Sequence, residues 1–349
     1  MGGDMDYQEA LASLERGQKQ AGMTVKFVPG KTTGGWLSDE TRVNLAPVFN
    51  ASPAQAVEKP SIQDMRDQMM GAPGSKKNIA KHPLQIENLV IDGVATRRYR
   101  LAALAGQTLP TVLYFHGGAY YGGSVAGAEM LRRALADFAG CQVISVDYPL
   151  APEHPFPAAP LACYRVLNYL HEHADWYQTT PAGFVLAGDS AGGGLVLTTA
   201  YLDRVVFATN WVEKLVLKYP DVPGAQIEDT SAGIEFKEFG EQMRAFFKSF
   251  SSDTLAWGSY FGTVGSLEHP LIAVINAPGI ERLPKTLVIS GEFDPLRLSN
   301  EKLVDRLRQT GVAVTHLRYN GVTHGFVDQV GYAPQAEDAL KEAAKFIKE

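Results

Sequence analysis

A tight turn at residues 188–192, between a buried strand and a helix, constrains this sequence more than any other feature. Residues 184–187 are apolar and predict a buried strand, and a helix-like pattern resumes over residues 195–206. Between them, Ser190 has a glycine two residues away on each side. This pattern is typical of a nucleophile elbow, where a strained turn exposes a serine hydroxyl. Gly and Ser are also common in ordinary loops, so the rest of the chain must decide the interpretation.

Short apolar or β-branched runs alternate with helical patterns from residue 84 onward. The strand-like runs are 84–91, 96–104, 111–115, 142–146, 184–187, 214–218, 286–289 and 313–318, and the helical patterns are 130–138, 161–171, 195–206, 300–310 and 336–347. This alternation predicts an α/β fold with a mostly parallel sheet covered by helices on both faces. The turn Asp92-Gly93 between the first two runs predicts a hairpin, which makes the sheet mixed.

Two regions do not fit the alternation. Residues 1–80 are polar and helix-prone and would make a poor core alone, whereas residues 221–268 carry aromatics at helix-like spacing without a clean strand. An insertion of this length is unusual for a plain connection. We therefore predict an N-terminal cap region at 1–80 and a catalytic domain at 81–349, with a cap insertion at about 221–268. The alternative is a surface subdomain that does not touch substrate.

Composition excludes several classes of function. The net charge of −6 gives no electrostatic footprint for nucleic acid or anionic membranes. No run approaches the roughly 18 apolar residues of a membrane span, and the acidic N-terminus lacks the profile of a signal peptide. Cys141 and Cys163 are expected to be buried free thiols. We expect a cytoplasmic protein without stable membrane insertion, and without a metal or cofactor, because neither metal-ligand spacing nor a phosphate-binding glycine loop is present.

A serine hydroxyl needs a base, and that base needs a carboxylate to orient it. Asp294 follows the predicted strand 286–289, and His324 follows the predicted strand 313–318. Both therefore lie at the carboxyl edge of the sheet, where active sites of open α/β sheets are found, and in the chain order serine, acid, histidine. Glu292 is an alternative acid. Asp294 is favoured because Pro295 fixes the turn directly after it.

The segment after the predicted strand 111–115 supplies an oxyanion loop. Its sequence is His116-Gly-Gly-Ala-Tyr120, in which small residues let the backbone approach a substrate carbonyl. We predict an oxyanion hole with N–H donors from Gly118 and Ala119, a loop shape set by Gly117, and a further donor from Ala191. His116 is expected to anchor this loop rather than act as a base.

Five motifs together resemble one known family. They are His116-Gly-Gly-Ala119, Asp147-Tyr-Pro-Leu-Ala-Pro-Glu-His-Pro-Phe-Pro157, Gly188-Asp-Ser-Ala-Gly-Gly193, Asp294-Pro-Leu296 and His324-Gly-Phe326. In this order they resemble the hormone-sensitive-lipase family (bacterial-type family IV) of carboxylesterases, in its Gly-Asp-Ser-Ala-Gly branch. The resemblance covers roughly residues 80–349. It implies an α/β-hydrolase fold with an eight-stranded sheet and a helical cap.

Two positions depart from the pattern of that family. A third glycine is frequent where this chain has Ala119, and an arginine is usual where it has Pro149. An alanine still offers its N–H if its backbone angles allow. The proline is expected to alter the local support of the site rather than its chemistry.

Together these features predict a serine carboxylesterase for short-to-medium acyl esters that works through an acyl-enzyme. The alternatives are an amidase, lactonase or carbamate hydrolase with the same triad, or a non-catalytic small-molecule receptor, which the presence of His324 disfavours. Pairing of the strand 313–318 across a two-fold axis would give a homodimer. The aromatic candidates for a substrate pocket are Trp36, Tyr120, Tyr121, Trp257, Tyr260 and Phe261.

Overall fold

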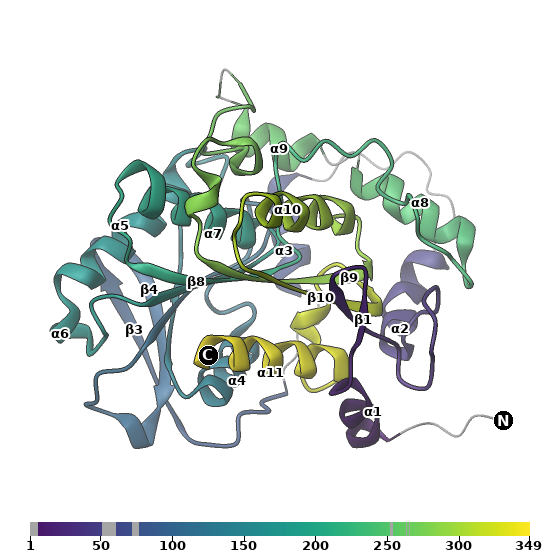
Figure 1. The fold of residues 1–349 in the computed structure, drawn as a ribbon, viewed down its shortest axis with the longest axis horizontal. Coiled ribbons are helices and arrows are strands. Elements are labelled where there is room, and N and C mark those ends of the chain that lie inside the picture. Colours follow the sequence, from purple (N-terminus) through teal and green to yellow (C-terminus); the bar gives the residue numbers. More distant parts are fainter. Residues whose placement is uncertain (1–5, 51–60, 72–76, 252–253, 263, 265) are drawn as a thin grey trace.

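The computed structural model describes residues 6–50, 61–71, 77–251, 254–262, 264 and 266–349 (Figure 1). Within them the strands are Gln18–Gln20 (β1), Met23–Lys26 (β2), Leu84–Ile91 (β3), Val94–Leu101 (β4), Thr111–Phe115 (β5), Gln142–Val146 (β6), Phe184–Asp189 (β7), Val212–Lys218 (β8), Lys285–Phe293 (β9) and Val314–Thr323 (β10). Every strand that the sequence predicts from residue 84 onward is present, with ends shifted by a few residues.

The helices alternate with these strands. The α-helices are Tyr7–Leu14 (α1), Asp39–Phe49 (α2), Ile62–Gly71 (α3), Glu129–Ala139 (α4), Ala158–Glu172 (α5), Ala174–Tyr177 (α6), Ala191–Tyr201 (α7), Gly240–Ser251 (α8), Thr254–Phe261 (α9), Arg297–Gln309 (α10) and Pro334–Lys348 (α11). Single turns of other helix types are Ala102–Leu104 (η1), Leu202–Val206 (η2), Val274–Asn276 (η3), Ile280–Arg282 (η4) and Phe326–Gln329 (η5).

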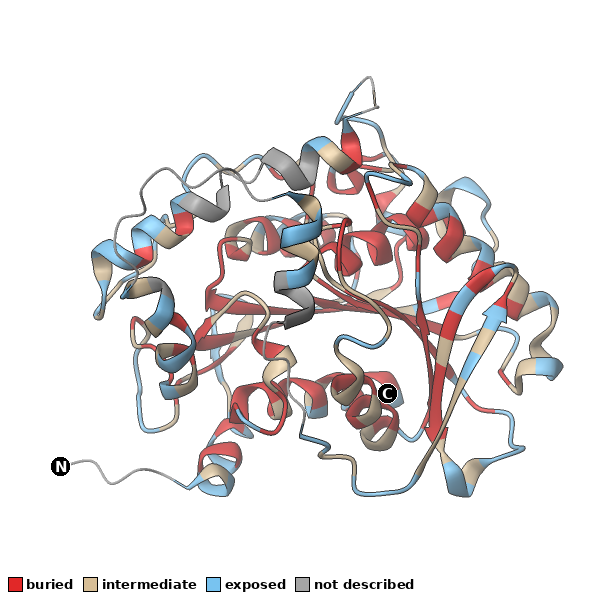
Figure 2. Cartoon of the chain, turned by 180° about the vertical axis from the view of Figure 1, so that it is seen from behind, coloured by how far each residue is buried: buried red, intermediate tan, exposed pale blue. Residues whose placement is uncertain are grey.

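All the described strands belong to one sheet in the order β1-β2-β10-β9-β8-β7-β5-β6-β4-β3. Neighbours from β2 to β6 are parallel, whereas β1, β4 and β3 pair antiparallel. The strand order reverses between β5 and β7, the place where open α/β sheets bind ligands. Strands β5, β6 and β7 are buried along their whole length (Figure 2), as expected for parallel strands covered on both faces.

Helices α5, α7 and α10 cover one face of the sheet, and α4 and α11 cover the other (Figure 1). Each side has its own hydrophobic core, which includes Val196 and Leu303 on the first and Leu135 and Leu340 on the second. Both cysteines are buried and free, which confirms that prediction.

The sheet has ten described strands rather than the expected eight. The sequence predicts a cap region that includes residues 18–26, but β2 pairs in parallel with β10, and β1 pairs with β2. These strands are too short and too polar for sequence periodicity to reveal them. Helix α1 packs on α11, where the Tyr7 hydroxyl donates a hydrogen bond to Glu337 (2.9 Å).

This pairing also corrects the expectation for the last strand. β10 hydrogen-bonds with β9 on one side and with β2 on the other, so it does not lie at the edge of the sheet. Its backbone groups along Leu317–Tyr319 are already paired. Along these three residues the strand is therefore not open for pairing across a two-fold axis.

Helices from the two regions outside the alternation meet near the carboxyl edge of the sheet. Leu45 of α2 packs with Met243 and Phe247 of α8 in a small apolar cluster. This cluster also contains Phe293, the last residue of β9. The N-terminal region and the insertion thus share one core directly beside Asp294.

Candidate active site

Ser190 stands at the turn between β7 and α7 in a strained conformation, with φ of +53°. Gly188 and Gly192 must be glycines, because neighbouring backbone atoms leave no room for a Cβ at either position. A Cβ on Gly188 would lie 2.5 Å from the carbonyl oxygen of Gly192, and a Cβ on Gly192 would lie 2.1 Å from that of Phe115. The spacing in the sequence thus reflects a turn pressed against its neighbouring strand. A strained non-glycine residue at such a turn is typical of a functional site.

Three side chains from three strand ends form one hydrogen-bonded row. The Nε2 atom of His324 lies 2.8 Å from the Oγ atom of Ser190. Its Nδ1 atom lies 2.9 Å and 3.1 Å from the two carboxylate oxygens of Asp294. The structure therefore brings together the three residues that the sequence predicts as nucleophile, base and acid. This is the arrangement in which a base removes a hydroxyl proton while a carboxylate fixes the imidazole.

The carboxylate of the alternative acid, Glu292, bonds to backbone groups instead. It accepts hydrogen bonds from the backbone N–H groups of Gly35 (2.8 Å) and Gly321 (3.1 Å). It thereby ties the N-terminal segment to β10. Asp294 is fully buried and also accepts a hydrogen bond from the N–H of Leu296 (2.8 Å), which fixes its carboxylate toward His324.

The electrostatic surroundings favour a proton on the imidazole. Burial lowers the pKa of His324, but the adjacent Asp294 carboxylate outweighs burial, with smaller contributions from Asp189 and Asp328, so that the pKa is raised on balance. The ring of Tyr219 meets the imidazole edge-on, with 4.9 Å between ring centres. The imidazole of His324 is therefore held by the Asp294 carboxylate and by the ring of Tyr219.

The loop after β5 presents backbone N–H groups beside the serine. Gly118 has φ of +129°, and Ala119 and Tyr120 also have positive φ (52° and 65°). Among the described residues, no acceptor is found for the N–H groups of Gly118 and Ala119. Ala191 opens α7, where the first N–H groups of a helix have no intrahelical partner. The N–H of Gly117 is instead used by the Asp189 carboxylate (3.0 Å).

His116 anchors this loop. Its ring stacks on Tyr148 (4.3 Å between centres), and its Nδ1 atom lies 2.8 Å from the carbonyl oxygen of Gly117. The Tyr148 hydroxyl donates to the carbonyl of His116 (2.6 Å). Burial lowers the pKa of His116 to about 4, so the ring is neutral near pH 7.

Three of the aromatic candidates line a small cavity one turn along α7 from the serine. Tyr120 stacks in parallel on Tyr260 with 4.0 Å between ring centres, and Phe261 packs edge-on against Tyr120. The cavity holds about 10 Å³, the room of a single water. Its lining residues are Tyr120, Phe156, Gly194, Leu195, Thr198, Pro223, Tyr260, Phe261, Leu271 and Ile272.

The other aromatic candidates lie elsewhere. Trp36 is half-buried, and the ammonium groups of Lys31 and Lys237 lie 4.5 and 5.2 Å from its ring centre. Tyr121 is buried, and its hydroxyl lies 3.8 Å from the Sδ atom of Met65. The side chain of Trp257 lies outside the described residues.

Sequence reasoning missed Asp221, the polar partner of Tyr120 beside this cavity. The Tyr120 hydroxyl donates to the Asp221 carboxylate (2.9 Å), and the Asp221 N–H donates to the carbonyl of Ser190 (2.9 Å). Burial raises the pKa of Asp221 to about 6, against lowering by Tyr120 and by His324. Asp221 comes three residues after the end of β8, so its place at the carboxyl edge was the available signal.

Arg66 of α3 was also missed. Its Nε donates to the carbonyl of Tyr121 (2.5 Å), and its Nη2 donates to the carbonyl of Ala151 (2.9 Å) and to Glu153 (2.6 Å). These contacts support the loops beside the site, in the neighbourhood of Pro149. A basic residue in a polar helix gives no sequence signal for such a role.

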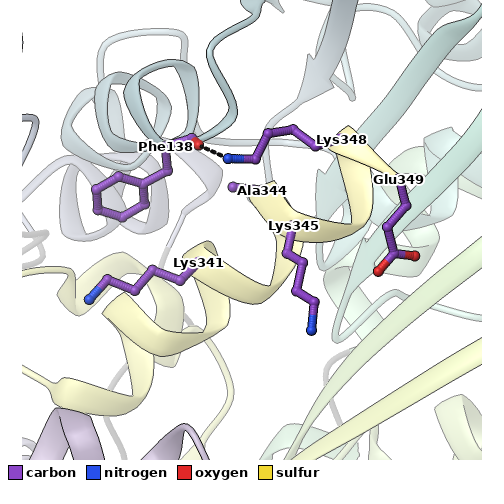
Figure 3. A pocket seen from close by; sticks show the side chains of 6 residues that line it. All are labelled: Phe138, Lys341, Ala344, Lys345, Lys348 and Glu349. Carbon is purple, nitrogen blue, oxygen red and sulfur yellow. Dashed lines mark hydrogen bonds between the residues drawn. The ribbon is translucent and has the colours of Figure 1, made fainter.

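A larger hollow lies between α4 and α11, away from these residues (Figure 3). It encloses about 530 Å³ and is open to solvent. Lys348 donates to the carbonyl of Phe138 (3.0 Å) at its rim. The residues that line it are Phe138, Lys341, Ala344, Lys345, Lys348 and Glu349, none of which the sequence singles out. In the described part of the chain, no helix is both long and apolar enough to cross a bilayer.

Comparison with known proteins places these features in context. Residues 112–328 match a family described as having the alpha/beta hydrolase fold. An arylesterase of Saccharolobus solfataricus is 32% identical over 218 residues, which are 62% of this chain and 68% of that protein. The carboxylesterase NlhH of Mycobacterium tuberculosis is 32% identical over 245 residues, covering 69% of this chain and 73% of that protein.

Solved esterase structures resemble the whole fold. The hyperthermophilic esterase of the archaeon Pyrobaculum calidifontis superposes with a TM-score of 0.74 and 30% identity, over 90% of this chain and 98% of that one. An ester-hydrolase from the metagenome of Lake Arreo, complexed with a derivative of bipyridine phosphonate, gives a TM-score of 0.76 at 26% identity, over 89% of this chain and 98% of that one.

Proposed function

The chain belongs to the alpha/beta-hydrolase family and is a carboxylic ester hydrolase, and from that premise we propose that it cleaves short-to-medium acyl esters through an acyl-enzyme on Ser190. The observation that carries this mechanism is the unbroken hydrogen-bonded row from Asp294 through His324 to Ser190. A serine alone is a poor nucleophile near neutral pH, and this row supplies the base that it lacks.

In the first half of the reaction, the Oγ atom of Ser190 attacks the ester carbonyl while Nε2 of His324 takes its proton. Asp294 holds the imidazole in the tautomer that exposes Nε2 and stabilises the imidazolium that forms. His324 then returns the proton to the alcohol oxygen as the ester C–O bond breaks. The alcohol leaves and the acyl group remains on Ser190.

In the second half, water replaces the serine as nucleophile. His324 removes a proton from the water, whose oxygen attacks the acyl carbon, and the proton then returns to Oγ of Ser190 as the acid leaves. In both halves the oxygen that becomes negatively charged faces the N–H groups of Gly118, Ala119 and Ala191. This role is supported because no acceptor for these N–H groups is found in the part of the chain that the structure describes. One such donor typically contributes about 10²–10³ in rate.

We also propose that α2, α3, α8 and α9 form a cap over the carboxyl edge of the sheet. The apolar cluster of Leu45, Met243 and Phe247 supports this, because it joins the two regions beside Phe293. A salt bridge between Arg42 and Glu238 (3.0 Å) also connects the N-terminal region to the insertion.

The preference for short-to-medium acyl chains is supported by the close packing of Tyr120 and Tyr260 beside Ser190. The parallel stack of Tyr120 on Tyr260 leaves little space beyond the serine. A long acyl chain would have to separate these rings and break the hydrogen bond between Tyr120 and Asp221.

The test is a series of p-nitrophenyl esters of increasing acyl length, assayed with the wild type and with Ser190→Ala. We expect kcat/KM to peak at short or medium chains and to vanish with Ser190→Ala. Ser290→Ala is the matched control, because Ser290 also bonds a histidine, His316 (2.9 Å), but in the core and without a carboxylate. A peak at long chains contradicts the substrate class, and wild-type activity in Ser190→Ala contradicts the mechanism.

A further inference from the structure

A chain of buried polar side chains lies beneath the oxyanion loop, and the mechanism above does not use it. The Nζ atom of Lys218 donates a hydrogen bond to the hydroxyl of Tyr114 (2.9 Å), and that hydroxyl donates to Oδ1 of Asp189 (2.5 Å). The second oxygen, Oδ2, accepts the N–H of Gly117 (3.0 Å). The chain thus starts at a buried cation and ends on the first glycine of the oxyanion loop.

The sheet register places these residues side by side. Asp189 is the cross-strand partner of Lys218 on β7 and β8, and Tyr114 pairs with Ala187 on β5 and β7. Because side chains two residues apart share a face, Asp189 lies on the same face as Ala187 and beside Tyr114. Lys218 and Tyr114 have no solvent exposure, and Asp189 has 7%.

We propose that Lys218, acting through Tyr114 and Asp189, is a positioning residue that holds the oxyanion loop in its productive geometry. This inference rests on the proposed acyl-enzyme mechanism and adds residues that lie outside the reacting site. Asp189 acts as the link, since its two oxygens bond the hydroxyl and the loop separately.

The close fit of the loop supports this assignment. A Cβ on Gly117 would lie 2.4 Å from Oδ2 of Asp189, so the carboxylate and the loop backbone are in direct contact. The backbone of Lys218 takes part as well, because its carbonyl accepts the N–H of Ser190 (3.0 Å). One residue therefore supports both the nucleophile and, through its side chain, the oxyanion loop.

The ammonium fixes the direction of the hydrogen bonds. A lysine ammonium has donors only, so Tyr114 must accept from it and is left to donate its own proton to Asp189. A neutral amine can accept that proton instead, which would withdraw the Tyr114 hydroxyl from Asp189. The charge on Lys218 therefore excludes the alternative in which Tyr114 donates to the amine instead of to Asp189.

The groups around Lys218 determine where it loses its proton. Burial lowers the pKa of Lys218 to about 8, while Asp189 and Asp328 raise it and Arg132 lowers it. Tyr114, the remaining partner, stays protonated because burial and Asp189 raise its pKa well above the usual value. We therefore expect kcat to decline above about pH 8, because deprotonated Lys218 no longer confines the Tyr114 hydroxyl to donating to Asp189.

The first test is Tyr114→Phe, which removes only the linking hydroxyl. Misplacing a donor costs less than removing one, so we expect kcat to fall about 10-fold with KM for a short ester nearly unchanged. A trifluoromethyl ketone, whose adduct with Ser190 carries an oxyanion, should bind more weakly by a similar factor. A merely structural role would not weaken this inhibitor while leaving KM intact.

Tyr319→Phe is the matched control. The Tyr319 hydroxyl also donates to a buried carboxylate, Asp338 (2.7 Å), which is paired with a buried lysine, Lys26 (2.9 Å). It lies on the same side of the sheet but has no link to the oxyanion loop. Equal kcat in the two variants, or a change in KM alone for Tyr114→Phe, overturns the proposal.

The second test is the pH profile of Lys218→Met, which keeps the length of the side chain and removes its charge. We expect the decline in kcat above about pH 8 to disappear in this variant, and a decline with an unchanged midpoint overturns the proposal. If the acyl-enzyme mechanism is wrong, Ser190→Ala retains activity. If only this inference is wrong, Ser190→Ala is inactive and Tyr114→Phe is fully active.

Discussion

Gly192→Ala tests whether the elbow must press against the strand beside it. The added Cβ would lie 2.1 Å from the carbonyl oxygen of Phe115 and 2.6 Å from that of His116, and both are backbone atoms that no rotamer change can move. Ordinary contact begins near 3.4 Å, so the turn and the end of β5 must separate by about 1.3 Å (3.4 minus 2.1). A misplacement of about 1 Å costs about 10²-fold in rate, so we expect kcat/KM to fall at least that far.

The assay is hydrolysis of p-nitrophenyl acetate, with the folded fraction measured by circular dichroism. Gly127→Ala is the control, because its Cβ would meet nothing closer than 3.6 Å. We expect Gly127→Ala to retain wild-type activity. If Gly192→Ala is folded and keeps more than about a tenth of wild-type kcat/KM, the argument that catalysis requires this close approach of the elbow to β5 is refuted.

Three further predictions concern the residues around the elbow. Asp294→Asn should lower kcat by roughly 10³–10⁴-fold in steady-state kinetics. Glu292→Gln should lower the melting temperature measured by calorimetry and change kcat by less than about 10-fold. Burial lowers the pKa of His324, but Asp294 raises it on balance. Because only the neutral imidazole accepts a proton, kcat/KM should fall toward acid pH, with an inflection above the ordinary range of histidine that Asp294→Asn moves down. Arg66→Ala should speed proteolysis within residues 61–71 and raise KM, while unchanged cleavage would show that α3 is held by other contacts.

Much of the fold could be predicted because its signals are local. The apolar runs of β5 and β7 and the helical period of α11 each specify one element without help from the rest of the chain. The order of Ser190, Asp294 and His324 at strand ends then follows from the geometry of a parallel sheet.

The features that were missed depend on contacts between distant segments. Residues 18–26 become strands only because β10 offers an open edge, and three or four polar residues carry no detectable period. Glu292 was a reasonable acid by composition, but two backbone N–H groups far away in the chain occupy it. Only the structure could assign it a role in joining the N-terminal segment to the sheet.

Charges in the core were the hardest to interpret. Lys218 stands in an apolar run, where a lysine would ordinarily weaken the prediction of a buried strand. Its partners, Tyr114 and Asp189, come from two other strands, so that sequence spacing cannot pair them. The position of Asp189 beside the nucleophile was visible, but its contact with the oxyanion loop was not.

The central claim is that Ser190 carries the acyl group during turnover, and rapid acid quenching tests it most directly. Wild-type protein mixed with p-nitrophenyl acetate, quenched within its first turnovers and analysed by peptide mass spectrometry, should carry one acetyl group on the peptide that contains Ser190. The acetyl group should be absent from Ser190→Ala and present on Ser290→Ala. An acetyl group on another residue, or equal acetylation of Ser190→Ala, would contradict the account.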